Sequence, residues 1–243
     1  MRSFGIVIAV LLSSASITAD TTPGVPPEGS GAEVLQRYLT ASETQKSAMR
    51  GMRSDVDIDA KLPKLKKEGR LHALRSISKV GQVTYRMLGF SGDNTIKKDV
   101  IARYLNAEVQ AQGNGQDLSI TPANYKFKFR GLQGHDGQQV YVFSVAPRKK
   151  EVGLFKGEIW LDPATCMPLR EQGRFVKNPS IFFRRMEFVR TYDIQDGVSR
   201  PLHIDSVVQT RIVGPVELSI NFDNYTRAPD DESEEPAAGG DSQ

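Results

Sequence analysis

The feature that most constrains this chain is a long series of segments in which apolar and polar residues alternate. Tyr125, Phe127 and Phe129, for example, are separated by Lys126 and Lys128, and similar segments follow almost to residue 222. Alternation with a period of two places the apolar side chains on one face of a β-strand. Gly, Asp, Asn and Pro stand between the segments at hairpin-length intervals, as turns require. The chain is therefore predicted to be mainly antiparallel β-sheet.

Strand periodicity also occurs earlier in the chain. Val56 and Ile58 alternate with three aspartates, which predicts a strand with one apolar and one acidic, solvated face. Further strands are predicted at about 71–80, 83–90, 125–130, 139–146, 157–161, 169–176, 182–194, 202–212 and 218–222. We expect nine to eleven strands in all. A sheet of this length with one apolar face must close, stack or curl over that face.

Two amphipathic helices are available to cover the apolar face. The first is predicted to begin near Ser30, which has capping-box spacing to Glu33, and to end near Lys46. The second is predicted from about Asn94 to Gln112. Its apolar face holds Ile96, Val100, Ile101, Tyr104, Leu105 and Val109. Its charged residues Lys97, Lys98, Arg103 and Glu108 are expected mostly on the other faces.

The two ends of the chain differ from its body. Residues 1–19 have a positive start, a short apolar run and small residues, the layout of a secretory signal peptide. The alternative, an uncleaved anchor, is disfavoured because the run is too short to span a bilayer. We expect a flexible leader at 20–31, a single β domain at 32–226 and a disordered acidic tail at 227–243.

The formal charge of +3 hides an asymmetry, because the part of the tail after Ala228 has six acidic residues and no basic one. The body is therefore clearly basic. A basic body can attract anionic surfaces such as phospholipid headgroups or nucleic acid. In an exported chain nucleic acid is not expected as a partner.

Metal chemistry is not supported by the spacing of possible ligands. No two histidines form a ligand pair such as H-x-x-x-H; they stand at His72, His135 and His203. The aspartates at 55, 57 and 59 lack the glycine and terminal glutamate of a calcium loop. No metal ligands and no cofactor are predicted.

Catalytic chemistry is not supported either. The chain has no G-x-S-x-G elbow and no glycine-rich phosphate loop. Cys166 is the only cysteine, and no histidine lies near it in sequence to activate it. We therefore expect no catalytic residues and no enzyme activity.

One pair of segments resembles a known family. The first is GEIWLDP at 157–163 followed by MPLRE at 167–171, and the second is the strand at 188–192 followed by DGVSRP at 196–201. Together with the order of helices and strands, they resemble the LolA-like lipoprotein-sorting and carrier proteins of the bacterial periplasm. The residue-level likeness covers about 45 residues. Arg50 and Arg53 lie near the early strand in which that family has a ligand-contacting arginine, but no role is assigned to them.

The resemblance implies an α+β fold, an unclosed half β-barrel whose concave face is plugged by helices. It implies a periplasmic carrier that shelters the acyl chains of a lipoprotein or lipid during transport toward the outer membrane. The implied partners are those acyl chains and inner- and outer-membrane transport proteins, and a monomer is expected. An alternative is a non-transporting envelope-stress sensor or interaction module of the same fold, with the acidic tail as a docking segment.

The apolar stripes of the strands and of the second helix are either plain core or the lining of an acyl-chain cavity, and both interpretations stay open. The candidate cavity residues are Val56, Ile58, Tyr85, Leu88, Phe90, Ile101, Leu105, Phe127, Phe129, Phe143, Phe182, Phe188, Ile204, Ile220 and Phe222. A lining of this kind needs no catalytic group, because burial of each methylene contributes about 0.8 kcal/mol.

Overall fold

The computed structural model describes residues 29–113, 118–178, 183–211 and 214–228. Ten strands form one antiparallel sheet in the order β3-β2-β1-β10-β9-β8-β7-β6-β5-β4. They are β1 Met52–Leu62, β2 Lys67–Ile77, β3 Val83–Gly92, β4 Tyr125–His135, β5 Gln138–Pro147, β6 Phe155–Leu161, β7 Pro168–Phe175, β8 Phe183–Gln195, β9 Val198–Thr210 and β10 Pro215–Arg227. Within the described ranges β3 and β4 are the two edges, so the sheet is not closed.

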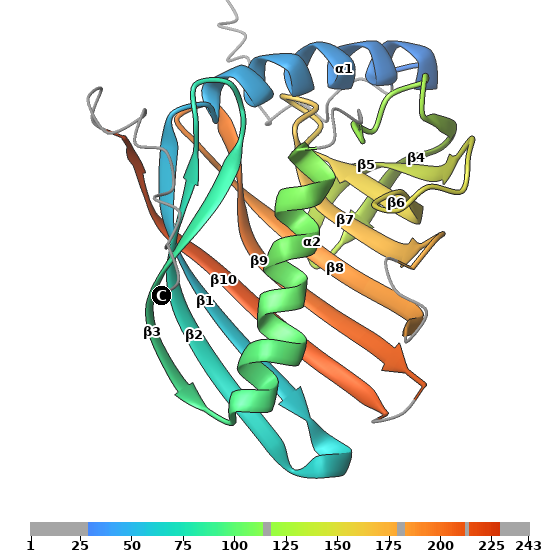
Figure 1. Ribbon diagram of the computed structural model, residues 1–243. Helices are drawn as coiled ribbons and strands as arrows, with labels where there is room; N and C mark the ends of the chain where they lie inside the picture. The colour runs from blue at the N-terminus through green and yellow to red at the C-terminus, as the bar shows by residue number, and fades with distance from the viewer. Residues whose placement is uncertain (1–28, 114–117, 179–182, 212–213, 229–243) are drawn as a thin grey trace, which may run out of the picture.

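Two helical segments lie on the concave side of this curved sheet (Figure 1). α1 (Gly31–Ala48) lies along one end of the sheet, and α2 (Ala102–Gly113) crosses the concave face. A π-helical segment, η2 (Ile96–Ile101), leads into α2, and a 3₁₀ turn, η1 (Pro63–Leu65), joins β1 to β2. The predicted fold class, an unclosed half-barrel of nine to eleven strands plugged by helices, is confirmed.

α1 begins where the capping signal places it. The Ser30 side chain accepts a hydrogen bond from the Glu33 backbone N–H over 3.3 Å, which satisfies one of the free donors of the first turn. Lys46 stands in the last turn, where a positive charge favours the helix dipole. Val34 and Tyr38 are the buried residues of the helix and face the sheet.

The pairing of β1 with β10 joins an early strand of the described chain to its last strand. Val56 stands opposite Phe222, and Ile58 stands opposite Ile220. All four side chains are buried, because the apolar positions of both strands point to the concave face. The aspartates between them point outward, where Asp57 Oδ1 lies 3.6 Å from Arg70 Nε.

Two of the hairpins have the tight turns that their sequences specify. Asp136-Gly137 joins β4 to β5, and Asp196-Gly197 joins β8 to β9. Both residues of each turn have positive φ: 50° at Asp136 and 81° at Gly137, and 52° at Asp196 and 71° at Gly197. Two-residue turns of this type match the right-handed twist of the flanking strands and favour Asp-Gly.

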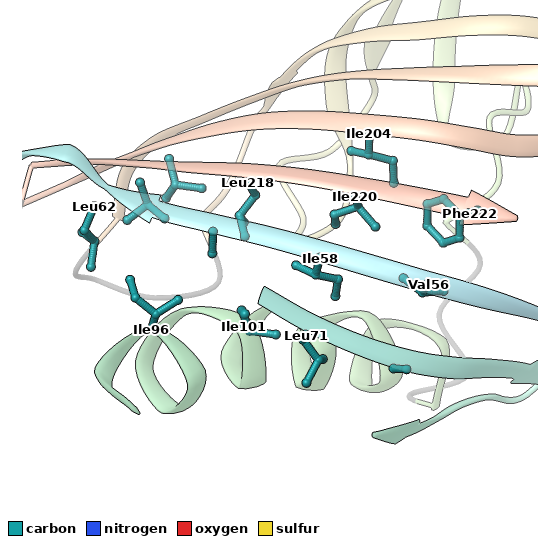
Figure 2. Close-up of a cluster of buried hydrophobic side chains, with 14 residues drawn as sticks. Val56, Ile58, Leu62, Leu71, Ile96, Ile101, Ile204, Leu218, Ile220 and Phe222 are labelled. Carbon is teal, nitrogen blue, oxygen red and sulfur yellow. The ribbon is translucent and has the colours of Figure 1, made fainter. Parts of the chain in front are cut away.

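The second helix differs from a regular α-helix at its beginning. The sequence predicts a helix from Asn94, and the structure is helical there, but residues 96–101 form a π-helix. In a π-helix the hydrogen bonds join residues five apart. Ile96 and Ile101, five apart, are both fully buried against the sheet, so the wider turn places both on one side (Figure 2).

Two apolar clusters fill the concave side. The α2 cluster has as its buried members Val56, Ile58, Ala60, Leu62, Leu71, Ala73, Ile96, Ile101, Ile204, Val208, Val216, Leu218, Ile220 and Phe222. The α1 cluster has Val34, Tyr38, Tyr125, Tyr141, Phe143, Val145, Leu154, Phe155, Ile159, Leu161, Cys166 and Phe188. Each helix therefore covers its own half of the sheet.

A glycine substitution tests how tightly the α1 half is packed. A Cβ on Gly157 would lie 1.9 Å from the carbonyl oxygen of Gln172 on the neighbouring strand. We expect Gly157→Ala to lower the free energy of unfolding by about 3 kcal/mol or more in urea titration, because backbone must move. Gly89→Ala is the matched control, with no atom within 4 Å of the added Cβ, and should change it by about 0.5 kcal/mol or less. An equal loss of unfolding free energy in the two variants would contradict close packing at Gly157.

Candidate functional site: the covered concave face

The apolar surface under the second helix is the first part of the candidate site. Side chains of β1, β2, β9 and β10 converge on Ile96 and Ile101 (Figure 2). Nine of the candidate residues predicted from sequence belong to this α2 cluster or pack against it: Val56, Ile58, Tyr85, Phe90, Ile101, Leu105, Ile204, Ile220 and Phe222. The helix thus rests on one continuous apolar strip of the sheet.

Other candidates lie elsewhere. Phe143 and Phe188 belong to the α1 cluster, and Phe127 and Phe129 pack against it. Leu88 belongs to neither cluster, because it is the extra residue of a bulge in β3 and its side chain is 48% exposed. Phe182 lies outside the described residues. The structure therefore divides the single lining expected from sequence into two halves.

A set of polar side chains borders the α2 cluster and reaches the α1 cluster at Phe188. We call it the arginine–tyrosine belt, because arginines, tyrosines and two glutamates interact there across β3, β2, β10, β9, β8, β7 and α2. Its members are Arg75, Tyr85, Tyr104, Glu108, Glu171, Arg190, Tyr192, Arg200 and Tyr225. The belt makes the concave face amphipathic instead of uniformly apolar.

One end of the belt ties α2 to the sheet. Arg75 Nη2 on β2 donates to Glu108 Oε1 on α2 over 3.2 Å, and Arg75 Nε donates to the Tyr85 hydroxyl over 3.1 Å. The Tyr85 hydroxyl in turn donates to Glu108 Oε2 over 2.7 Å. These three groups form a closed ring of charge-assisted hydrogen bonds, which we call the Glu108 clasp.

The other end of the belt lies on β7 and β8. Arg190 Nη1 donates to Glu171 Oε2 over 3.2 Å and to the Tyr192 hydroxyl over 3.4 Å. Glu171 is buried, so its charge requires this partner. The guanidinium carbon of Arg190 also lies 5.8 Å from the centre of the Phe188 ring, at the border of the α1 cluster.

Tyr104 on α2 connects the two ends electrostatically. Burial, and then the negative charge of Glu108, raise the pKa of Tyr104 above its usual value. The positive charges of Arg190 and Arg75 act in the opposite direction on this pKa. Burial also raises the pKa of Tyr225 to about 12, against the opposing charge of Arg75. At neutral pH both tyrosines therefore keep their protons, and the Tyr225 hydroxyl donates to the Pro201 carbonyl oxygen over 2.7 Å.

Glu108 is an exception among the charged residues of the second helix. These residues were expected mostly away from the apolar face, yet Glu108 bonds to Arg75 and Tyr85 of the sheet. The signal lies in the periodicity: Glu108 is four residues after Tyr104 on the apolar face. Arg75 likewise continues the inward series of Leu71 and Ala73. A charged residue at a position where the sequence periodicity predicts an inward, apolar side chain is thus the sequence signal for the belt.

Other kinds of site have less support in the part of the chain that the structure describes. No group of three or more His, Cys, Asp or Glu there could hold a metal ion. Cys166 is buried in the α1 cluster, and burial raises the pKa of its thiol, which disfavours the reactive thiolate. His135 stacks on the Trp160 ring at 4.0 Å between centres, a packing role. No described helix is both long enough and apolar enough to span a membrane.

Two grooves lie on the opposite, convex face of the sheet. One, of about 590 Å³, is lined by residues of β1, β9 and β10 that include Asp59, Asp205 and Glu217. The other, of about 930 Å³, lies over β4 to β8. Its basic lining residues are Lys126, Lys128, Arg130, Lys156, Arg174 and Arg185. Charged walls make both grooves poorly suited to an acyl chain.

Comparison with known proteins gives a distant likeness of fold. No family model and no curated protein matches the chain. One similar solved structure is a LolA superfamily protein from Nitrosomonas europaea, with 12% identity, a TM-score of 0.42, and 81% of this chain and 94% of that chain covered. A DUF1329 family protein from Desulfovibrio piger has 12% identity and a TM-score of 0.44, with 81% of this chain and 92% of that chain covered. An outer membrane lipoprotein-sorting protein domain from Vibrio parahaemolyticus has 14% identity and a TM-score of 0.43, with 80% of this chain and 92% of that chain covered. They include the family that the sequence resembles. Values this low say nothing about what this chain binds.

Removal of one hydroxyl tests the Glu108 clasp. Tyr85→Phe leaves Arg75 Nε and Glu108 Oε2 without that partner, and we expect a loss of about 2 kcal/mol in the free energy of unfolding. Thr84→Ala, an exposed neighbour on the same strand, is the control and should lose about 0.5 kcal/mol or less. Urea titration of both variants measures this difference, and a Tyr85→Phe variant as stable as the parent would show that the clasp contributes nothing.

Proposed function

We propose that this chain is a periplasmic binding protein that shelters an acyl chain between the second helix and the concave face of the sheet. α2 acts as a lid in this proposal, and the predicted signal peptide delivers the chain to the periplasm. One observation supports this most directly: the apolar strip of the sheet is covered by a single helix, and the Glu108 clasp is its polar attachment to the sheet.

The two parts of the second helix have different attachments. η2 is anchored by Ile96 and Ile101, which are fully buried, and Lys67 binds Thr95 just before it over 3.0 Å. Farther along, Leu105 only partly buries its side chain against the α2 cluster, and Val109 is 38% exposed. A helix anchored at its start and clasped near its end can open as a lid about η2.

The surface under the lid is large enough for an acyl chain. Along β1 the apolar positions run from Val56 to Leu62, a length of about 20 Å at 3.3 Å per residue. Burial of a dozen methylenes there contributes roughly 10 kcal/mol before the costs of ordering and of opening the lid. A hydrogen bond to a charged group typically contributes about 1.5–3 kcal/mol. The three hydrogen bonds of the clasp together therefore contribute less than burial of the acyl chain.

The proposed lining consists of the candidates that lie in or against the α2 cluster. The candidates around the α1 cluster are proposed to be structural, because they pack against Val34 and Tyr38 of α1 and against one another. Transport toward the outer membrane, with lipoprotein acyl chains or lipid as cargo and membrane transport proteins as partners, is the role that the sequence resemblance suggests. A sensor or interaction module of the same fold is the competing function.

Loosening the clasp tests the lid. Glu108→Gln removes the charge that Arg75 holds, and we expect a fluorescent long-chain fatty acid to bind about tenfold more tightly, because less free energy is needed to open α2. The control is Asp99→Asn, which removes the exposed ion pair with Arg103 near the start of the same helix. Its affinity should match that of the parent within about twofold.

Equilibrium titration of parent, Glu108→Gln and Asp99→Asn decides between the two functions. Saturable binding with the expected order supports the lipid-binding lid. No saturable binding by any of the three would contradict it and favour the interaction module. In that case, deletion of residues 228–243 followed by a test of partner binding examines the tail as a docking segment.

A further inference from the structure

Arg190 has unused hydrogen-bonding capacity at the edge of the proposed acyl site. Both of its hydrogen bonds, to Glu171 and to Tyr192, are made by Nη1. Its Nε is buried and has no partner among the described residues. Buried donors are nearly always satisfied in proteins, so this exception calls for a physical reason.

The unused edge of Arg190 has the geometry that binds planar anions. Nε and Nη2 form the side of the guanidinium that donates two parallel hydrogen bonds to a carboxylate or phosphate. Because Nη1 alone holds Glu171, an incoming anion can use the other edge while the ion pair stays intact. The side chain of Arg190 is 35% exposed, so it is within reach of solvent.

The surroundings of Arg190 favour a negative ligand. Within the belt, Arg75 is balanced by Glu108 and Arg190 by Glu171. Arg200 adds a further positive charge, and its acidic neighbour Asp196 is 89% exposed and 3.6 Å away. The Tyr192 hydroxyl accepts a hydrogen bond from Arg190 Nη1 over 3.4 Å, and Tyr104 of α2 packs against the α2 cluster. The belt therefore has one more basic than acidic group in its covered part.

The position of Arg190 relates the anion to the acyl site. Arg190 stands opposite Ile204, a buried member of the α2 cluster, across the β8–β9 pair. Ile204 in turn stands opposite Ile220 on β10. An anion at Arg190 is thus at the side of the apolar strip, in the cross-strand row of Ile204, Ile220 and Ile58.

We propose that the Nε edge of Arg190 binds the anionic headgroup of an amphiphile whose apolar chain lies under α2. The headgroup is a carboxylate or a phosphate. This rests on the proposed function, since the chain enters under the same lid. It adds that the ligand is a lipid with an anionic group, and that Arg190 Nε, which has no partner among the described residues, is the donor that this group uses.

Ligands that share one chain and differ in headgroup test the proposal. Dodecanoate, dodecyl phosphate and dodecanol are titrated into the full mature chain below their micellar concentrations, by competition with the fluorescent fatty acid. We expect at least one anion to bind about tenfold more tightly than dodecanol. Dodecanoate and dodecyl phosphate distinguish a fatty-acid-like from a phospholipid-like headgroup.

Variants assign the preference to Arg190. Arg190→Met should abolish the preference for the anion and leave the dodecanol affinity within about twofold. Arg185→Met is the matched control, because Arg185 lies on the same strand, 52% exposed and in the convex groove. The double variant Arg190→Gln with Glu171→Gln removes both charges of the pair, so it tests the same loss if Arg190→Met fails to fold.

The outcomes separate the headgroup site from the carrier function. If all three ligands bind the parent equally, the headgroup site is wrong while the lipid-binding function stands. If the anion preference survives in Arg190→Met and in the double variant, Arg190 is not the site. If none of the ligands binds, dodecanol included, both the function and the headgroup site are overturned.

Discussion

The pairing of β1 with β10 is the interaction on which the rest of the structure depends. It joins residues more than 150 positions apart and turns a short N-terminal β-sheet and a long C-terminal one into a single sheet of ten strands. Because inward positions meet inward positions, the paired strands form the centre of one apolar strip, with Ile58 opposite Ile220. That strip cannot face water, so the second helix has to lie on it.

The arginine–tyrosine belt sets the limits of this apolar strip. Buried charged groups are costly unless they are paired, and replacement of such groups by apolar ones often stabilises a protein. The belt is therefore poorly explained by stability alone. A helix that must cover the sheet and also leave it benefits from a polar attachment such as the Glu108 clasp. When the helix leaves, the groups of such a clasp can bond to water instead, so the net cost of breaking each bond is modest.

The two helices illustrate a division between structure and proposed function. α1 packs through Val34 and Tyr38 into an aromatic cluster, with Tyr38 and Phe127 at 6.5 Å between ring centres. Arg37 of the same helix also bonds to the carbonyl oxygen of Ala164 in the β6–β7 turn over 2.5 Å. α2 has a mixed apolar and polar contact surface. We infer that α1 is the fixed cover and α2 the movable one.

Much of the architecture follows from the sequence alone, because it depends on local signals. The alternation of apolar and polar residues predicted the strands. Asp136-Gly137 and Asp196-Gly197 form two of the turns, and Ser30 caps the start of α1. These signals act within a few residues, so no knowledge of the fold is needed. The same signals explain why the inward face of each strand could be named in advance.

Only the tertiary structure decided which inward side chains meet. The division of the candidate residues into two clusters depends on strand order and on where each helix lies, neither of which periodicity specifies. The bulge that exposes Leu88 depends on a mismatch between β2 and β3. The contact of Glu108 with Arg75 joins elements 33 residues apart in sequence. The sequence determined the faces of the elements, and long-range packing determined the site, because a charge at an inward position is meaningful only when its partner is known.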